Sequence, residues 1–209
     1  DIEKRVKEIA KLKKTKSLCF DTETTGKDPI HDELLGISFA NSAGKAIYFQ
    51  CPSEIDLRKV FIEDFRELFQ DESIEKVGHN LKFDLPVLHW CGLKVGGALF
   101  DTMLAHTLVF PDQKHSMDFV AESMLGYSPI SFNSLIDDQE NEDQLSLIGT
   151  TISEVDTNKL AEYAAEDADI TFQISEKLRP LLKEKGQEKV FYDIESPLIA
   201  ILVAIESEG

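Results

Sequence analysis

Asp21 and Glu23 are the first side chains in this sequence whose types and spacing could do chemistry. They end the segment Leu18-Cys-Phe-Asp-Thr-Glu23, whose apolar start predicts a buried strand. Successive side chains on a strand alternate between its faces, so both carboxylates point to one face and can share a cation. Burying them without a cation would be costly. Taken alone, however, Asp-x-Glu is more simply a hydrated pair at a strand end.

Asp84 ends a second segment, Gly78-His-Asn-Leu-Lys-Phe-Asp84. Asn80 and Asp84 are four residues apart and share a face if the intervening turn is helical. Pro86 favours a regular helix that begins near Asp84, which would leave this carboxylate by the helix N-terminus. The simpler interpretation is that Asn80 or Asp84 only caps the helix.

Tyr163 and Asp167 form the third segment, Tyr163-Ala-Ala-Glu-Asp167. The i to i+4 spacing on a predicted helix places the phenol beside the carboxylate. A tyrosine on an apolar helix face more often packs in the core, and Asp167 could equally be an exposed acid beside Glu166 and Asp169. Each of the three segments is therefore ambiguous by itself.

The surrounding pattern predicts the elements that must position these side chains. Helices are expected at 2–14, 56–70, 82–91, 102–109, 116–125, 157–178 (with Pro180 near its end) and 190–206. Strands are expected at 17–23, 34–40, 46–50 and 98–100, with another ending at Val77 and a hairpin turn at 41–44. This order predicts the α/β class, a mixed sheet flanked by helices with ligands at strand ends. Residues 137–143 are all polar and predict a solvated loop.

Length and composition predict one main globular domain. The chain has 209 residues, of which 42% are hydrophobic and 29% charged. It contains neither a run of about 18 apolar residues nor a signal-peptide pattern, so an intracellular protein is expected. Cys19, Cys51 and Cys91 lack metal-ligand or redox spacing and predict buried, reduced thiols.

The charge balance argues against a nucleic-acid partner when it is taken alone. There are 39 acidic and 22 basic residues, for a net charge of −17, whereas nucleic-acid binders usually neutralise phosphates with Lys and Arg. An enzyme that gathers cations around a phosphate also needs carboxylates. The placement of the acidic residues must therefore decide.

The ordered combination Asp-x-Glu, Asn-x3-Asp and Tyr-x3-Asp is far more specific than any one segment. It resembles the three exonuclease motifs of the DEDD superfamily, in the branch with tyrosine in the third motif, and within it the proofreading domains of the bacterial DNA polymerase I family. The resemblance covers nearly the whole chain and rests on Phe20-Asp-Thr-Glu-Thr24, Gly78-His-Asn-Leu-Lys-Phe-Asp84, Phe100-Asp-Thr-Met-Leu104 and Tyr163-Ala-Ala-Glu-Asp-Ala-Asp169. It implies a ribonuclease H-like, DnaQ-like exonuclease fold.

The resemblance also implies a function, a 3′-5′ exonuclease that proofreads single-stranded or frayed DNA 3′ ends in replication and repair. Two divalent ions, Mg²⁺ or Mn²⁺, would activate water and stabilise the transition state. The implied metal ligands are Asp21, Glu23, Asp84 and Asp167. Tyr163 would orient the attacking water. The implied substrate contacts are Thr24, Asn80 and Phe132.

Two positions depart from the family pattern at the substrate end. Lys27 stands where the family often carries an apolar wedge, and His79 stands where glutamine is usual. The resemblance therefore does not assign Lys27 and His79 a role in holding the terminal base.

The resemblance further implies how the chain is organised. Residues 1–189 would be the exonuclease domain with its lead-in helix, and 190–209 would begin a covalently linked polymerase domain. That domain would supply much of the basic DNA-binding surface. We expect a monomer in the bacterial cytoplasm, at the nucleoid. Its expected partner is a single-stranded DNA 3′ end, and no membrane contact is expected.

Two alternatives remain at this level. A ribonuclease D-like enzyme would share the carboxylates and the tyrosine but trim RNA 3′ ends; the segment around Asp84 and the polymerase-like C-terminal residues favour DNA. A catalytically silent domain could merely brace a polymerase. The presence of all four carboxylates and Tyr163 favours an active enzyme.

Overall fold

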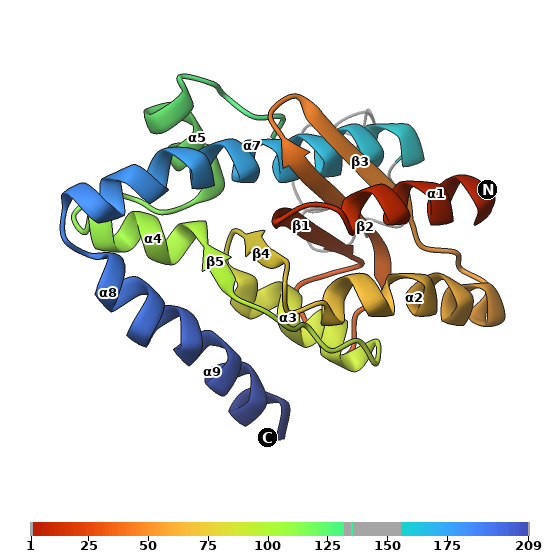
Figure 1. The fold of residues 1–209 in the computed structure, drawn as a ribbon. Coiled ribbons are helices and arrows are strands. Elements are labelled where there is room, and N and C mark those ends of the chain that lie inside the picture. Colours follow the sequence, from red (N-terminus) through yellow and green to blue (C-terminus); the bar gives the residue numbers. More distant parts are fainter. Residues whose placement is uncertain (1, 132–134, 136–155, 209) are drawn as a thin grey trace, which may run out of the picture.

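The computed structural model describes residues 2–131, 135 and 156–208, and its centre is a five-stranded sheet (Figure 1). The sheet has the order β3-β2-β1-β4-β5. Its strands are β1 (Ser17–Thr24), β2 (Leu34–Ser42), β3 (Lys45–Gln50), β4 (Glu75–Gly78) and β5 (Leu99–Asp101). The helices are α1 (Ile2–Leu12), α2 (Ile55–Gln70), α3 (Leu81–Trp90), α4 (Thr102–Val109), α5 (Met117–Leu125), α7 (Thr157–Glu184), α8 (Glu188–Val190) and α9 (Ser196–Glu208), with a π-helical turn η2 (Phe191–Glu195).

The sheet is mixed, as the sequence predicts. β1 pairs with β4 and β4 with β5 in parallel, whereas β1–β2 and β2–β3 are antiparallel. The α/β class is therefore confirmed. β1 is the central strand, with β2 on one side and β4 on the other.

The two faces of β1 belong to different hydrophobic cores. Leu18 and Phe20 pack into the core formed with α1, α2, α3 and α9, whereas Cys19 packs into the core formed with α4, α5 and α7. Asp21 and Glu23 continue the Cys19 side by alternation, so they face α7. The helices α7 and α3 lie on opposite sides of the sheet (Figure 1).

Phenylalanines dominate the core beneath the start of the Asp-x-Glu segment. The rings of Phe20 and Phe69 meet edge to face with centroids 5.2 Å apart, and Phe39 stacks on Phe65 at 5.5 Å. Aromatic pairs of this geometry stabilise a core beyond the area they bury. They hold α2 against the strand that carries Asp21.

Two predicted helix limits are wrong. α3 begins at Leu81, one residue before the expected range 82–91 but three residues before the start near Asp84 that Pro86 favours, because Asp101, far along the chain, accepts the Leu81 N–H group. α7 continues through Pro180 to Glu184. Pro180 lies on the exposed side, so buried leucines of the last turns keep the helix in place.

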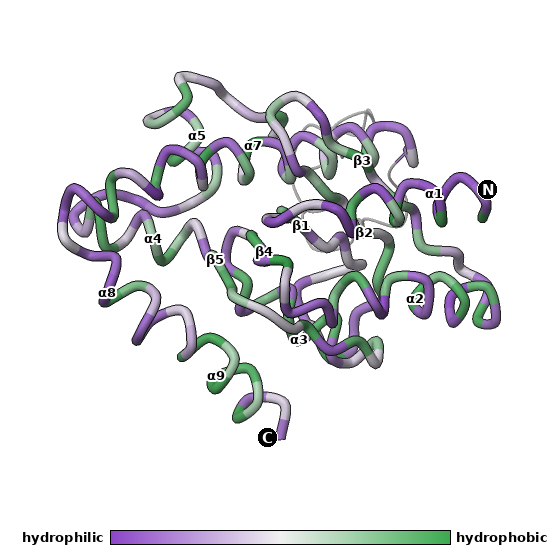
Figure 2. The backbone as a smooth tube through the Cα atoms, viewed as in Figure 1, coloured by the Kyte–Doolittle hydropathy of each residue, from purple (hydrophilic) through white to green (hydrophobic). Residues whose placement is uncertain are grey.

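The predicted helix at 190–206 is also interrupted. α8, η2 and α9 follow one another from Glu188 to Glu208, with a π-helical turn between the two α-helices. Figure 2 shows α9 as a largely hydrophobic helix, in contrast to the mostly hydrophilic α1. The predicted loop at 137–143 lies outside the described residues.

Cys19 and Cys51 are buried and Cys91 is half-buried, all three as free thiols. Cys91 is therefore less buried than the sequence predicts. Within the part of the chain that the structure describes, no helix combines the length and the apolar character needed to cross a membrane.

Asp101, buried at the end of β5, caps two helices at once. Its Oδ1 atom accepts the N–H groups of Met103 (2.8 Å) and Leu104 (3.2 Å), the first turn of α4. Its Oδ2 atom accepts the N–H group of Leu81 (2.7 Å), the first residue of α3. One carboxylate therefore fixes the start of α3, the helix that carries Asp84.

Asp101→Ala should lower the free energy of unfolding by about 2 to 4 kcal/mol, because several buried N–H groups lose their acceptor. Urea unfolding measures this change. Exposed Asp112→Ala is the matched control and should stay within about 0.5 kcal/mol of the parent. Equal midpoints for Asp101→Ala and the parent would contradict the double cap.

Candidate active site

Three carboxylates meet where α7 passes the end of β1. Asp21 and Glu23 project from β1 and Asp167 from α7, and their oxygen atoms lie within 4.8 Å of one another. Within the described residues, this is the one group of three acidic, histidine or cysteine side chains close enough to hold a metal ion. Tertiary packing thus brings together the first and third segments.

Asp84 reaches the same place from the other side of the sheet. Its Oδ1 atom accepts hydrogen bonds from the backbone N–H group (3.0 Å) and the hydroxyl (2.6 Å) of Thr22. Asp84 is only 2% exposed, and its charge raises the pKa of Asp21. The fourth carboxylate is therefore a neighbour of the cluster, held in place by β1 itself.

Thr22 is a residue that the motif analysis did not single out. Its position between Asp21 and Glu23 carries the signal, because alternation must turn it to the opposite face of β1. A hydroxyl on that face can form hydrogen bonds only with groups on the α3 side of the sheet. Thr22 thus links the first segment to the second.

The four carboxyl groups are hard to ionise together. Burial is the main cause: it raises the pKa of Glu23 to about 8 and those of Asp84 and Asp167 to about 7. Burial and then the charge of Asp84 raise the pKa of Asp21 well above its usual range. Near pH 7 such a cluster holds protons unless cations neutralise it.

The donor set fits a hard divalent cation. Carboxylate oxygens are the ligands that Mg²⁺ and Mn²⁺ prefer. The Oε1 atom of Glu23 is buried and has no hydrogen-bond partner, which is costly for a polar atom unless a ligand satisfies it. An ion among Asp21, Glu23 and Asp167 would do so.

Tyr163 lies one helical turn before Asp167 and is hydrogen-bonded to its carboxyl group. Burial, followed by the charge of Asp167, raises the pKa of the phenol far above its usual range. In the ion-free protein the phenol therefore donates a hydrogen bond to the Asp167 carboxylate. It is placed to position a polar group beside that carboxylate.

The cluster lines a hollow of about 520 Å³, a size suited to a small ligand or part of a polymer. Lys27 is exposed at this hollow and Phe83 is a half-buried aromatic in its wall. The lining residues are Asp21, Thr22, Glu23, Thr24, Thr25, Gly26, Lys27, Phe83, Tyr163 and Asp167. Phe83 is a second residue that the sequence interpretation did not select.

The predicted substrate contacts have different positions. The Thr24 hydroxyl donates to the carbonyl of Gly26 (2.6 Å), so it fixes the turn after β1 while lining the hollow. Asn80 is exposed and does not line it. Phe132 lies outside the described residues.

Asn80 precedes α3 with φ 64°, the one positive φ of a non-glycine residue among those described. Asparagine tolerates this left-handed conformation better than most residues. Its side chain makes no capping hydrogen bond, since Asp101 caps the helix instead. Asn80 therefore occupies the N-cap position, as one interpretation of the sequence expects, but its side chain does not cap the helix.

His79 is not part of the hollow. Its Nδ1 atom lies 2.8 Å from the Thr102 hydroxyl, and burial lowers its pKa to about 4. It is a neutral residue in the wall between β4 and α4. The departure from glutamine at this position thus affects a packed histidine rather than a group that lines the site.

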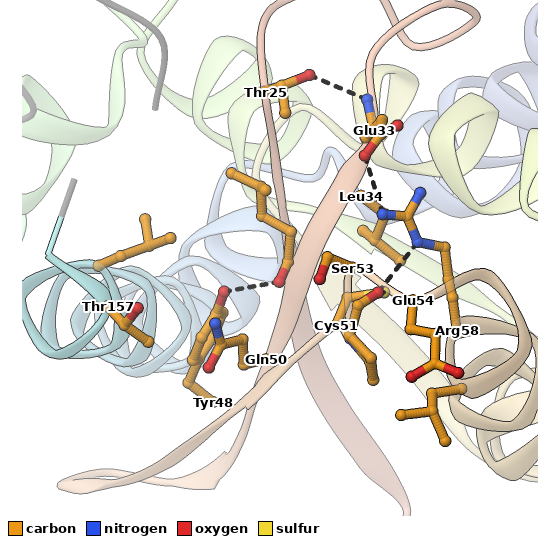
Figure 3. Close-up of a pocket in the computed structure, with 14 residues that line it drawn as sticks. Thr25, Glu33, Leu34, Tyr48, Gln50, Cys51, Ser53, Glu54, Arg58 and Thr157 are labelled. Carbon is orange, nitrogen blue, oxygen red and sulfur yellow. Dashed lines mark hydrogen bonds and ion pairs between the residues drawn. The ribbon is translucent and has the colours of Figure 1, made fainter. Parts of the chain in front are cut away.

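A larger hollow of about 600 Å³ adjoins the site through Thr25 (Figure 3). Arg58 is the only cation among the residues that line it, and it is occupied by Glu33 (2.9 Å) and by the carbonyl of Pro52 (3.2 Å). No group of metal ligands lies there within the described part of the chain. The chemistry therefore belongs to the smaller hollow.

Comparison with known proteins relates this geometry to a family. Residues 2–183 match a family model described as 3′-5′ exonuclease. The chain is 33% identical over 204 residues to the DNA polymerase I of Borreliella burgdorferi, covering 96% of this chain and 21% of that protein. It thus spans about a fifth of the length of that polymerase.

Solved structures show the same fold. Escherichia coli RNase D, described as an exoribonuclease involved in structured RNA processing, superimposes with a TM-score of 0.71 at 18% identity, covering 95% of this chain and 48% of that one. Brucella melitensis NrnC with bound Mg²⁺ gives 0.67 at 22% identity, covering 93% and 85%. These neighbours confirm the predicted ribonuclease H-like fold.

Mg²⁺ should stabilise the protein more at pH 8.5 than at pH 5.5. Carboxyl groups whose pKa is raised in the folded state stabilise it at low pH, and this contribution disappears as the pH passes about 7 to 8. A cation that replaces the protons reverses the loss. At ~100 times its Kd, Mg²⁺ should contribute about 2.7 kcal/mol, roughly 5 to 10 °C in thermal midpoint.

Thermal unfolding with EDTA or Mg²⁺ at both pH values measures the effect. Glu23→Gln is the control, because it keeps the shape of the side chain and removes one titrating ligand. Equal stabilisation at both pH values, or in the parent and Glu23→Gln alike, would contradict the assignment of a cation to this cluster.

Proposed function

The chain belongs to the 3′-5′ exonuclease family, and from this membership we propose that it removes nucleotides from DNA 3′ ends as the proofreading domain of a bacterial DNA polymerase I. One observation carries the proposal: Asp21, Glu23 and Asp167 converge within 4.8 Å at the wall of a hollow, on the fold of this family. Such a cluster suits phosphodiester hydrolysis, in which negative charge develops on phosphate.

We propose two Mg²⁺ or Mn²⁺ ions as cofactors. The NrnC structure, a fold neighbour, has bound Mg²⁺, and the unpartnered Glu23 Oε1 atom supports a ligand role here. When bound, the ions would lower the pKa of water and neutralise charge on the transition state. Asp21, Glu23 and Asp167 would hold one ion, and Asp21 would also bind the second ion. Asp84, fixed by Thr22, would support the second through waters.

Tyr163 would orient the attacking water. Its phenol is hydrogen-bonded to Asp167, so its oxygen can accept a hydrogen bond from that water. This role needs geometry rather than basicity. It agrees with the raised pKa of the phenol.

The substrate would be a single strand with its 3′ end in the hollow. A volume of about 520 Å³ leaves room for an unpaired terminal nucleotide and not for a duplex. Lys27 would contact phosphate and Phe83 would offer an aromatic surface for a base, contacts that tolerate any sequence. Asn80, Thr24 and Phe132 remain proposed contacts from the family resemblance.

The proposed organisation follows the relatives. Residues 1–189 would form the exonuclease domain and 190–209 would begin the polymerase domain, since the similar polymerase is about five times as long as this chain. We propose a monomer that works on bacterial DNA in the cytoplasm. A basic polymerase surface would offset the net charge of −17 when DNA binds.

RNA trimming is the second candidate, and the fold likeness to RNase D favours it. At 18% identity that likeness concerns the fold alone, whereas the curated relative at 33% identity is a DNA polymerase. DNA is therefore the proposed substrate. A silent domain is disfavoured because all four carboxylates and Tyr163 are present.

Asp21→Ala and Asp167→Ala should each lower exonuclease turnover at least ~10²-fold, as the loss of a major transition-state stabiliser does. Release of nucleotides from an end-labelled oligonucleotide measures turnover. Asp112→Ala, an exposed acid away from the cluster, should keep the parent rate. Unchanged turnover in a folded Asp21→Ala protein would refute the metal assignment.

Single-stranded DNA should be degraded at least about tenfold faster than a fully paired end, because a paired nucleotide must first unstack and unpair at a cost of a few kcal/mol. EDTA should abolish the activity, and Mg²⁺ or Mn²⁺ should restore it. Matched DNA and RNA oligonucleotides complete the experiment. Equal rates on paired and frayed ends would argue against proofreading, and faster RNA cleavage would favour the RNA-trimming candidate.

A further inference from the structure

The two acidic neighbours of Asp167 make contacts that the metal cluster does not explain. The Glu166 carboxylate accepts the hydroxyl of Tyr127 and, at 2.7 Å, the N–H group of Ile130. Both partners follow α5, whose end is marked by Gly126 in the left-handed conformation. Glu166 thus connects α7 to the segment that leaves α5.

Asp169 connects the same turn of α7 to the sheet. Its Oδ1 atom accepts the N–H group of Gly44 (2.7 Å), at the tip of the β2–β3 hairpin, and its Oδ2 atom accepts from the Gln173 amide (2.8 Å). Gly44 has φ 73°, so its N–H direction depends on a glycine turn. The segment after α5 is therefore hydrogen-bonded to Glu166, just before Asp167, and the β2–β3 turn is hydrogen-bonded to Asp169, just after it.

The part of α7 around Asp167 buries only small side chains. Ala164 and Ala168 are fully buried beneath it, and between Leu160 and Ile170 no large apolar side chain of the helix is buried. Small side chains let a helix approach a sheet closely but interlock less than large ones. A rotation of a few degrees would swing Tyr163 and Asp167 away from β1.

We propose that Glu166 and Asp169 are positioning residues of the exonuclease, whose hydrogen bonds to the 127–130 segment and to Gly44 fix the rotation of α7 so that Asp167 and Tyr163 meet Asp21 and Glu23. The proposal rests on the proposed function of the cluster. It assigns neither residue a contact with substrate or metal. Misplacing a catalytic group by about 1 Å can cost ~10²-fold in rate.

Matched substitutions separate hydrogen bonding from charge. In Glu166→Gln the amide oxygen can accept from Ile130 while the NH₂ group donates to the Tyr127 oxygen. In Asp169→Asn the amide oxygen can accept from Gly44, and the Gln173 amide can turn to accept from the NH₂ group. The alanine variants lose both hydrogen bonds and charge.

Glu166→Ala and Asp169→Ala should lower kcat on single-stranded DNA about tenfold or more, with KM changed less than about threefold. Glu166→Gln and Asp169→Asn should recover to within about threefold of the parent kcat. Thermal unfolding of each variant with EDTA or Mg²⁺ gives a second readout: the alanine variants should remain folded but show a smaller Mg²⁺-induced shift. Amide variants as slow as the alanine variants, or alanine variants at the parent rate, would overturn the positioning role.

Asp21→Ala in the same assays distinguishes a failure of the positioning role from a failure of the proposed function. If Asp21→Ala is inactive while Glu166→Ala and Asp169→Ala are normal, the cluster is catalytic and the positioning role is wrong. If Asp21→Ala retains full activity, the proposed function of the cluster is wrong, and with it the premise of the positioning role.

Discussion

Burial of four neighbouring carboxyl groups is the constraint on which the site depends. Asp21, Glu23, Asp84 and Asp167 are crowded where little water reaches them, and burial raises the pKa of each. Such a group disperses unless the chain holds it or cations neutralise it. The fold therefore needs rigid supports for each carboxylate, and the two cores on either face of β1 provide them.

Some acidic residues of the motifs cluster at the candidate site, and others form hydrogen bonds that fix neighbouring helices, turns and loops. Asp101 caps α3 and α4, Asp169 binds the β2–β3 turn, and Glu166 binds the segment after α5. Each accepts backbone N–H groups, which a carboxylate does better than a neutral side chain. Part of the large negative charge of this chain is thus structural and says nothing about its ligand.

The two hollows show why the size of a cavity is a poor guide to its chemistry. The larger one has a single arginine already paired with Glu33, whereas the smaller one has three converging carboxylates, a protonated phenol and an exposed lysine. The smaller one is where several carboxylates converge, so a cation can neutralise them together. The strand end at the centre of a mixed sheet is also where ligands gather in α/β folds.

The sequence alone determined the mixed sheet, which follows from the order of strands and helices along the chain. It also determined the common face of Asp21 and Glu23 and the pairing of Tyr163 with Asp167, which follow from the local periods of strand and helix. Their order along the chain pointed to the exonuclease family. Tertiary structure alone decided that Asp84 arrives from the opposite face and binds Thr22, that α3 starts at Leu81 under the cap of Asp101, and that Glu166 and Asp169 face other segments. Those contacts join residues 20 to 125 positions apart, and no local period can specify which distant group a side chain will meet.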